Sequence, residues 1–497
     1  MPTRIPEVAV GLDFGTSGLK TVAVAADGDI VARAEASYPT LRPAPGRAEQ
    51  DPRDWQRAAA RALGSLAAAV HPKRWVALGL SGMIPTLVLT DADGAPVRPA
   101  ITWEDNRAEP QAERLRRTLG PAAVYATTGQ WLDGRYLLPM FAWVREHEPT
   151  PTERVAHLAG AKDYLFWWLT GTWATDPSTA TGVGCFDLEA GRWSPEILAA
   201  AGWDGGPALP EVRPSDSTKP LRADAASALG LPQGLPVCLG AADSVLAARG
   251  LGATEPGQVA YVAGTSTVIL AVSDGPRRDA AHRFLLTPTP DPGRWGLEMD
   301  LISSGATVSW LVRLIVPGAD ESEIWRLAEG SVPGAHGVAL LPYLGHGEQG
   351  ALWDPSLRGT IAGLSASHSR EDLARALLEG LVLESRRCLQ VLEGSGVPRG
   401  EILLAGRGGG AACFRTALAD ASGRRVEIPG GVAYPASAWG AASLAWASVG
   451  AAPPDPPADA DALGAMPTPE ATRVWDALWV RHEHLRQAVR RWPGPTT

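Results

Sequence analysis

The chain reads GLDFGTSGLK over residues 11–20, and this stretch carries the strongest local signal for the fold. An apolar run over residues 8–13 precedes it, and residues 19–25 alternate with β-branched side chains, as strands do. The four residues between them, 15–18, are polar or glycine. The pattern therefore predicts two strands joined by a polar turn, with a third strand expected over residues 29–37.

The residues of this turn suit contact with phosphate. Gly15 lets backbone N–H groups come close to phosphate oxygens, and Thr16 and Ser17 add hydroxyl donors. Asp13, at the end of the first strand, can hold Mg²⁺ through water, because Mg²⁺ keeps several waters and takes few carboxylates. A plain hairpin with a polar turn is the alternative interpretation.

A similar pattern occurs again past the midpoint of the chain. The tripeptide Gly264-Thr265-Ser266 lies between strand-like runs at residues 258–264 and 267–272. About half the chain separates the two glycines, a period too long for a solenoid of short repeats. The repetition of this pattern indicates two related domains that face each other.

Asp243 follows a run of small residues, 240–242, and precedes an expected helix over residues 244–249. A carboxylate at a strand end can accept a proton from an attacking hydroxyl during phosphoryl transfer. The same residue can simply cap the helix, and the two roles are compatible.

Two further segments have competing interpretations. Trp103 offers an apolar face for a sugar ring, and Asp105 and Arg107 offer groups that bind hydroxyls, although the segment also reads as a charged helix start. The glycine run at 406–410 resembles a dinucleotide-binding fingerprint, with Glu427 about twenty residues on. With two Gly-Thr-Ser turns upstream, a glycine run beside adenosine phosphates fits better.

Composition limits the class of protein. At roughly 100–200 residues per domain, 497 residues suggest two or three domains. The net charge of −9 argues against general nucleic-acid binding, and the four cysteines form no C-x-x-C pair, which disfavours zinc and a disulfide framework. The sequence has no run of about 18 apolar residues and no signal-peptide pattern, so we expect a cytoplasmic protein without a membrane span.

Taken in order, these segments resemble the FGGY family of carbohydrate kinases, and most of all its xylulose-phosphorylating members. Besides the stretches above, family-like motifs are Glu49-Gln50-Asp51-Pro52 with Trp55, Arg98-Pro99-Ala100-Ile101, Lys162-Asp163-Tyr164, Thr175-Asp176, Leu341-Pro342-Tyr343-Leu344, Leu418-Ala419-Asp420 and Gly440-Ala441-Ala442, the last two on the adenosine side. The likeness runs from about residue 8 to residue 447, and each motif alone is weak.

The resemblance implies an α/β fold of two ribonuclease-H-like domains, as in actin and hexokinase, flanking a catalytic cleft. Residues 1–244 would form the sugar-binding domain with the first phosphate loop, and residues 245–497 the ATP-binding domain with a C-terminal helix. ATP and Mg²⁺ are the expected cofactors, a small sugar the partner, and a homodimer the oligomeric state seen in many relatives. Asp243 would be the general base, with D-xylulose converted to D-xylulose 5-phosphate.

The resemblance also implies three sets of site residues. Substrate-binding residues would be Ile84, Pro85, Trp103, Asp105, Arg107, Asp243 and Ser244. ATP- and phosphate-binding residues would be Asp13, Gly15, Thr16, Ser17, Lys20, Gly264, Thr265, Ser266, Gly305, Gly406, Gly408 and Gly409. Asp13 and Asp243 would hold Mg²⁺ through water.

The chain departs from the family pattern on the sugar side. Where xylulose-phosphorylating members have Q-M-H-G, residues 83–86 read Met-Ile-Pro-Thr, so a hydrogen-bonding ring is missing. The polar residue after the catalytic aspartate is the short Ser244, and residues 347–351 lack the family's arginine. Kinase chemistry is therefore expected, while the acceptor is open to another ketose, a polyol or a sugar acid. A non-catalytic sugar or nucleotide sensor, and a dinucleotide oxidoreductase, are the alternatives.

Overall fold

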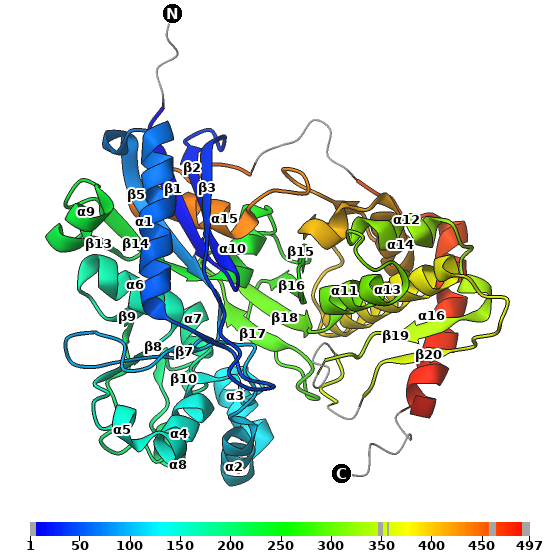
Figure 1. Ribbon diagram of the computed structural model, residues 1–497, viewed down its shortest axis with the longest axis horizontal. Helices are drawn as coiled ribbons and strands as arrows, with labels where there is room; N and C mark the ends of the chain where they lie inside the picture. Colours follow the sequence, from blue (N-terminus) through cyan, green and yellow to red (C-terminus); the bar gives the residue numbers. More distant parts are fainter. Residues whose placement is uncertain (1–5, 346–350, 355–356, 457–463, 490–497) are drawn as a thin grey trace, which may run out of the picture. The chain divides into compact units, whose positions relative to one another are not determined.

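The structure is a computed structural model that describes residues 6–345, 351–354, 357–456 and 464–489 (Figure 1). It divides into two compact units. The first comprises Met1–Gly250, Leu285–Gly296 and Pro435–Pro457, and the second comprises Leu251–Phe284, Leu297–Tyr434 and Ala458–Thr497. The predicted two-domain α/β organisation is confirmed, whereas the boundary between residues 244 and 245 stays a prediction.

The first unit is built on a six-stranded mixed sheet in the order β13-β14-β5-β1-β2-β3. The chain enters through an antiparallel hairpin of β1 and β2, and β5 and β14 then add in parallel to the other side of β1. The strands are β1 (Val8–Phe14), β2 (Gly18–Ala25), β3 (Ile30–Ser37), β5 (Trp75–Gly82), β13 (Thr218–Pro220) and β14 (Pro236–Ala242). The three predicted N-terminal strands and their turn are confirmed.

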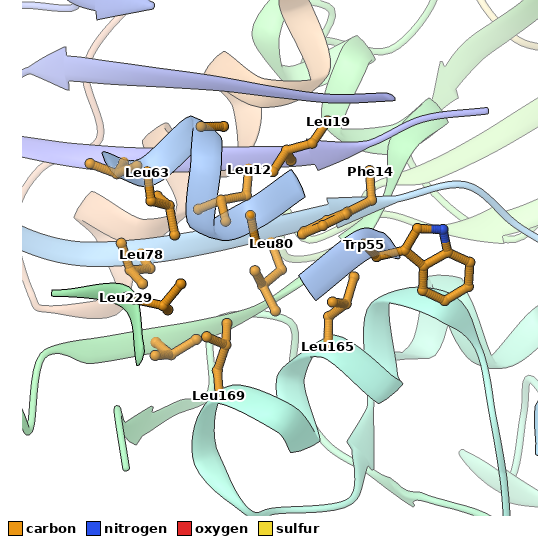
Figure 2. Packing of buried hydrophobic residues seen from close by; sticks show 14 of the residues in the cluster. Leu12, Phe14, Leu19, Trp55, Leu63, Leu78, Leu80, Leu165, Leu169 and Leu229 are labelled. Atoms are coloured by element: carbon orange, nitrogen blue, oxygen red, sulfur yellow. The ribbon is translucent and has the colours of Figure 1, made fainter. Parts of the chain in front are cut away.

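Helix α1 (Pro52–Ala69) covers one face of this sheet. It begins where the Asp51 side chain accepts a hydrogen bond from the backbone N–H of Arg53, and proline stands at its first position. Its inner face buries Trp55 and Leu63 against strand residues such as Leu12 and Phe14 (Figure 2). Burying such side chains is the main favourable term in folding.

Helix α15 (Ala436–Ser448), drawn in orange, packs against β1 and β5 although it lies more than 350 residues away in sequence (Figure 1). The contact depends on small residues, since a Cβ on Gly11 would lie 1.8 Å from the Ala438 carbonyl oxygen and one on Gly79 would lie 2.1 Å from that of Ala441. The indole N–H of Trp439 donates to the Gly28 carbonyl at 2.9 Å. Helix α15 thus completes the first unit, although it lies far along the chain from the strands that it covers.

The remaining elements of the first unit surround this sheet. They are β4 (Glu49–Gln50), η1 (Pro72–Arg74), β6 (Val88–Thr90), β7 (Ala100–Ile101), α2 (Glu109–Leu119), α3 (Pro121–Thr128), α4 (Leu137–His147), α5 (Pro149–Thr152), β8 (His157–Ala159), α6 (Ala161–Thr170), β9 (Ala174–Thr175), α7 (Pro177–Thr181), β10 (Phe186–Asp187), β11 (Arg192–Trp193), α8 (Pro195–Ala200), β12 (Glu211–Val212), α9 (Ala223–Leu229) and α10 (Asp243–Gly250).

A second six-stranded sheet has the order β17-β18-β16-β15-β21-β22. Its strands are β15 (Val259–Ala263), β16 (Thr267–Ser273), β17 (Leu285–Pro288), β18 (Trp295–Leu301), β21 (Ile402–Ala405) and β22 (Val426–Glu427). β17 and the first residues of β18 fall in the segment Leu285–Gly296, which belongs to the first unit. The second unit also contains α11 (Ser304–Ile315), α12 (Ser322–Glu329), η2 (Ala335–Gly337), β19 (Ala339–Leu341), β20 (Thr360–Ala362), α13 (Arg370–Gly394), η3 (Arg407–Gly410), α14 (Ala412–Ser422) and α16 (Pro469–Val489).

Helix α16 is joined to the second unit by a buried polar cluster. His482, 3% exposed, contacts Glu384 of α13 through Nε2 at 2.6 Å, and Tyr343 donates to the same carboxylate oxygen at 2.6 Å. Trp475 is 4% exposed. In the sequence, Trp475, Leu478, Trp479, His482, Leu485, Val489 and Trp492 lie at helical spacing, which predicts a helix that packs onto the body. The prediction is confirmed for Trp475 and His482, while Trp492 lies outside the described residues.

The sequence over residues 83–90 is a further strand-like run, which predicts a strand there. The structure forms a strand only over Val88–Thr90, so the prediction is wrong for residues 83–87. β5 instead continues through Gly82, and the Met83 N–H donates to the Phe14 carbonyl at 3.0 Å. Pro85 follows and has no N–H to donate to a ladder. The described helices include none long and apolar enough to cross a membrane.

Candidate active site

The predicted acceptor and phosphate residues of the first unit meet at one edge of its sheet. In the parallel ladders, Asp13 pairs with Ser81 and Phe14 with Gly82, while Ala242 pairs with the same Gly82. Asp243 comes directly after Ala242. Because Ala241 pairs with the same Ser81 as Asp13, Asp243 lies on the other side of β5, two residues beyond the position level with Asp13.

Ile84 and Pro85, both half-buried, follow the central strand of these three. The edge therefore presents a carboxylate on each side and the altered sugar motif between them. Parallel strands that end together are the usual place for ligands in α/β sheets.

Asp13 is held by its neighbours on both sides. The Ser81 hydroxyl donates to Asp13 Oδ1 at 2.9 Å, and Lys20 stands opposite Asp13 in the β1–β2 ladder. Burial raises the pKa of the Asp13 carboxyl above its ordinary value, and the Ser81 hydrogen bond and the Lys20 charge oppose that rise. A cation beside this carboxylate would favour its ionised form.

Side chains from three other segments hold the first phosphate turn, residues 15–17. Tyr38 donates its hydroxyl to the Gly15 carbonyl, and Gln50 Nε2 donates to the Thr16 carbonyl at 2.7 Å. Trp103 Nε1 donates to Thr16 Oγ1 at 3.0 Å. The carbonyls of Gly15 and Thr16 are thus bonded to side chains of the protein, while the Gly15 N–H donates to the Gly18 carbonyl at 3.1 Å within the hairpin.

Gln50 is the centre of this arrangement. It is fully buried, and its Nε2 also donates to Thr40 Oγ1 at 2.7 Å, while its Oε1 accepts from Trp55 Nε1 at 2.9 Å. Tyr38 and Gln50 were not predicted as site residues. Gln50 belongs to a motif that was recognised, but a sequence gives no direct sign of which backbone group a distant amide will contact.

Asp105 and Arg107, predicted to bind sugar, bond to each other. Arg107 Nη2 lies 2.6 Å from Asp105 Oδ2, and Arg107 Nη1 lies 2.8 Å from Glu49. Asp105 also accepts from the Ala48 N–H at 2.7 Å, and its side chain is 1% exposed. These contacts give both residues a structural role around Trp103, and sugar binding by them stays a prediction.

Asp243 and Ser244 open helix α10, as the alternative interpretation of Asp243 expected. The Ser244 N–H donates to Asp243 Oδ1 at 3.0 Å. Ser244 is buried and Asp243 half-buried. A helix N-terminus favours a negative charge, so this position suits an ionised carboxylate.

The predicted ATP-side residues of the second unit also come together. A Cβ on Gly305, near the start of α11, would lie 2.1 Å from the Gly264 carbonyl oxygen and 3.1 Å from Thr265 Cα. The next residue, Ala306, donates its N–H to the Thr265 carbonyl at 3.0 Å. Gly305 therefore supports the loop 264–266 by direct backbone contact.

The glycine run lies on the other side of the same strand end. Gly406 has φ +95°, and a Cβ there would lie 2.2 Å from the Ala263 carbonyl oxygen, while a Cβ on Gly408 would lie 3.3 Å from Ala263 Cβ. A Cβ on Gly409 would lie 1.8 Å from Leu404 Cδ2. Three segments far apart in sequence thus meet around Ala263 and Gly264.

Residues of two motifs assigned to the adenosine side make packing contacts, and their role at a nucleotide stays a prediction. Gly440, Ala441 and Ala442 lie in α15 of the first unit, where a Cβ on Gly440 would lie 2.0 Å from the Leu246 carbonyl oxygen. Asp420 Oδ1 accepts from the Thr468 N–H at 2.8 Å just before α16 begins. Small residues and a helix-capping acid look alike in a sequence whether they face a nucleotide or a neighbouring helix.

The arginine-less stretch, residues 347–350, lies outside the described residues. Among the residues that the structure describes, no three or more His, Cys, Asp or Glu side chains gather as a metal-ion cluster. Mg²⁺ is compatible with one or two carboxylates, because water and phosphate supply its other ligands.

This fold and this pair of loops define a phosphotransferase of sugars, and the comparisons agree. The model of the FGGY family of carbohydrate kinases, N-terminal domain, matches residues 8–250, and the model of the C-terminal domain matches residues 259–449. The chain belongs to the FGGY family of carbohydrate kinases. The predicted class, an ATP-dependent carbohydrate kinase, is confirmed, with ATP as co-substrate, and the oxidoreductase alternative is set aside.

The chain is similar to xylulose kinase of Escherichia coli strain K12, with 32% identity over 442 residues, 88% of this chain and 89% of that protein. It is also similar to gluconokinase of Bacillus subtilis strain 168, with 28% identity over 386 residues, 75% of this chain and 74% of that protein. The solved structure of xylulose kinase from Rhodospirillum rubrum matches with a TM-score of 0.84 and 30% identity, covering 97% of this chain and 98% of that one.

Proposed function

We propose that this protein transfers the γ-phosphoryl group of ATP to a hydroxyl of D-xylulose, giving D-xylulose 5-phosphate. The observation that carries the proposal is the shared sheet edge, where Asp13 lies at the end of one strand and Ile84-Pro85 and Asp243 follow the two strands next to it. The similarity to xylulose kinases supports D-xylulose as the acceptor.

Asp243 is the general base in this proposal. Its carboxylate accepts the proton of the acceptor hydroxyl as that oxygen attacks the γ-phosphorus, and the bond from γ-phosphorus to the β,γ-bridging oxygen breaks to release ADP. The start of α10 and the bond from the Ser244 N–H favour the ionised form that a base requires.

The phosphate loops stabilise the charge that develops on the transferred group. The donors are backbone N–H groups of residues 16–17 and 265–266, because the Gly15 and Gly264 N–H groups bond within their own turns. Hydrogen bonds hold the first turn in place, and glycine contacts hold the second. Lys20, opposite Asp13, adds a positive charge on the first loop's side.

Asp13 and Asp243 would hold Mg²⁺ through water. The fit rests on Asp13, whose carboxyl loses solvation by burial and bonds to one hydroxyl through a single oxygen, so a divalent cation would favour its charged form. Such an ion neutralises phosphate charge when bound.

A different acceptor remains the second candidate. Ile84 and Pro85 present apolar atoms where a hydrogen-bonding ring is expected, and a gluconokinase is among the relatives. Loss of one polar partner can change discrimination between acceptors by several kcal/mol. A ketose other than xylulose, a polyol or a sugar acid is therefore included in the test.

An ADP-release assay of the purified protein tests the proposal. The panel is D-xylulose, D- and L-ribulose, D-gluconate, glycerol and erythritol, each with ATP and Mg²⁺. We expect the highest kcat/KM with D-xylulose. A higher kcat/KM with another acceptor would mean that this acceptor, and not D-xylulose, is the substrate. Ligand binding without ADP release across the panel would favour a non-catalytic sensor.

A further inference from the structure

A fully buried lysine lies against β14, the strand that directly precedes Asp243. Lys162 of α6 is 0% exposed, and its Nζ lies 3.0 Å from Asp163 Oδ1 and 3.1 Å from Asp176 Oδ1, whose side chains are 1% and 0% exposed. Burying three charges is costly, and apolar residues of similar volume often do as well or better. The cluster therefore calls for a role beyond filling the core.

Strand β14 is irregular where it passes this cluster. Its ladder with β5 shifts register between Cys238 and Ala241, and Gly240 has φ +77°. A Cβ on Gly240 would lie 1.6 Å from the Leu80 carbonyl oxygen, so only glycine fits. Bulges of this kind displace backbone groups from the ladder and re-aim the side chains that follow.

The buried cluster supplies partners for the backbone on both sides of the bulge. Lys162 Nζ donates to the Leu239 carbonyl at 3.2 Å, before the bulge. Ser178 Oγ accepts from the Ala242 N–H at 2.9 Å, after it. Buried backbone groups without partners would be costly, so these bonds stabilise the bulged geometry.

Asp176 joins these two contacts into one network. Its Oδ1 lies beside Lys162, and its Oδ2 accepts from the Ser178 N–H at 2.9 Å and from the Ser178 hydroxyl. Ser215 Oγ donates to the same oxygen at 3.3 Å. A continuous path thus runs from Leu239 through Lys162, Asp176 and Ser178 to Ala242, the residue before Asp243.

We propose that Lys162, Asp176 and Ser178 are positioning residues for phosphoryl transfer, which act by fixing the backbone bulge that aims Asp243 at the acceptor hydroxyl. The proposal rests on the proposed function of Asp243 as general base. None of the three is itself proposed to touch substrate.

The segment that contains Ser178 also reaches the altered sugar motif. Gly182 directly follows α7, which contains Ser178, and a Cβ on Gly182 would lie 3.5 Å from Pro85 Cβ. Residues 178–182 therefore adjoin both the strand that precedes Asp243 and the segment proposed to meet the acceptor, which is where a positioning element would be expected.

Ser178→Ala tests the proposal because it removes one hydroxyl from the network. With D-xylulose, or the best acceptor of the panel, we expect kcat to fall roughly 10- to 100-fold, since small misplacements of a reacting group have such effects. The KM for ATP should stay at the wild-type value, and Ser178→Thr, which restores the hydroxyl, should recover part of kcat.

Ser422→Ala is the matched control. It removes another buried hydroxyl, which donates to the Leu418 carbonyl at 2.6 Å in α14 of the second unit. It should keep the wild-type kcat and lower the melting temperature about as much as Ser178→Ala does. If Ser178→Ala does not fold, Asp176→Asn is measured instead, with the same expected loss of kcat at unchanged KM for ATP.

The parallel variant Asp243→Asn separates the two proposals. Suppose that Asp243→Asn is inactive and that Ser178→Ala folds and keeps the wild-type kcat. The positioning role of Ser178 is then wrong, and the role of Asp243 as general base is retained. If Asp243→Asn keeps turnover, the base is wrong and the positioning role falls with it. A loss of kcat in Ser178→Ala that Thr does not restore, with an equal rise in KM for ATP, also overturns positioning.

Discussion

The two phosphate loops are alike in sequence but are held in different ways. Residues 15–17 receive hydrogen bonds from the side chains of Tyr38, Gln50 and Trp103. Residues 264–266 instead meet the backbone of Gly305, with the glycine run on the far side of Ala263. One loop therefore depends on polar side chains that lie far away in sequence, and the other depends on the absence of side chains.

This difference suggests how each loop responds to change. Removal of one hydrogen bond should destabilise the conformation of the first loop only slightly, because each neutral hydrogen bond contributes about 1 kcal/mol. A loop held by close backbone contact has no room for one added carbon, so the smallest substitution must displace it. The ATP side should thus be the more sensitive to single substitutions.

Among substitutions that compare the two loops, the largest effect is expected for Gly305→Ala, since the added methyl would lie 2.1 Å from the Gly264 carbonyl oxygen. Displacement of the second loop should lower kcat/KM for ATP roughly 100-fold. The measurement is the initial rate over a range of ATP at saturating acceptor. Gly394→Ala, where a Cβ meets nothing within 4 Å, is the control, and normal ATP kinetics in Gly305→Ala would contradict the account.

A smaller effect is expected for Gln50→Leu, which removes the bond to the Thr16 carbonyl and the bonds to Thr40 and Trp55. We expect kcat/KM for ATP to fall about tenfold, the equivalent of about 1.4 kcal/mol. Gln56→Leu makes the same change in α1, where Gln56 donates to Tyr164 at 2.8 Å, and should leave the kinetics unchanged. Equal kinetics in both variants would show that the first turn keeps its conformation without the hydrogen bonds of Gln50.

The acceptor side should respond to Ile84→Met combined with Pro85→His, which restores the ring that xylulose-phosphorylating relatives carry. A new hydrogen bond to a hydroxyl should raise kcat/KM for D-xylulose relative to glycerol about fivefold. Ile84→Met alone serves as the control. No change in the ratio would show that residues 84–85 do not contact the acceptor.

The smallest effect concerns stability rather than catalysis. Burial acts to raise the pKa of Glu384, but Arg387 and His482 hold it well below its ordinary value. A depressed pKa contributes stability above the unfolded-state value of about 4.3, and this contribution is lost as pH falls. Glu384→Gln should thus lower the melting temperature most near neutral pH.

As pH falls below about 4, the difference between the melting temperatures of wild type and Glu384→Gln should shrink, because the unfolded carboxyl takes up a proton first. The difference should vanish only below the depressed pKa of native Glu384. Glu323→Gln, at an exposed pair with Arg326 in α12, should differ little from wild type at any pH. A difference between Glu384→Gln and wild type that grows in acid would contradict the assigned direction.

Much of the fold was predictable because its signals are local. The first hairpin follows from the alternation over residues 19–25 and the glycines of its turn, and α1 follows from Asp51-Pro52 and its apolar face. The return of α15 to the first unit was not predictable. Its small residues fit Gly11 and Gly79, but the sequence does not say which sheet they meet.

The residues of the candidate site fall into the same two groups, those with a local sequence signal and those without one. Residues at strand ends and in glycine turns, such as Asp13, Asp243 and Gly264, were recognised from their own neighbourhoods. The side chains that hold them, Gln50 and Ser178 among them, act through backbone atoms of other segments. Such partnerships depend on register, which only the folded structure supplies.

The central claim is that Asp243, placed beside β5 and Asp13, is the base of a sugar kinase. The most direct measurement compares wild type and Asp243→Asn for phosphoryl transfer to the best acceptor and for ATP affinity on the same preparations. The account predicts a loss of kcat of about 10²- to 10⁴-fold with unchanged ATP affinity. Turnover at the wild-type rate in Asp243→Asn would contradict it.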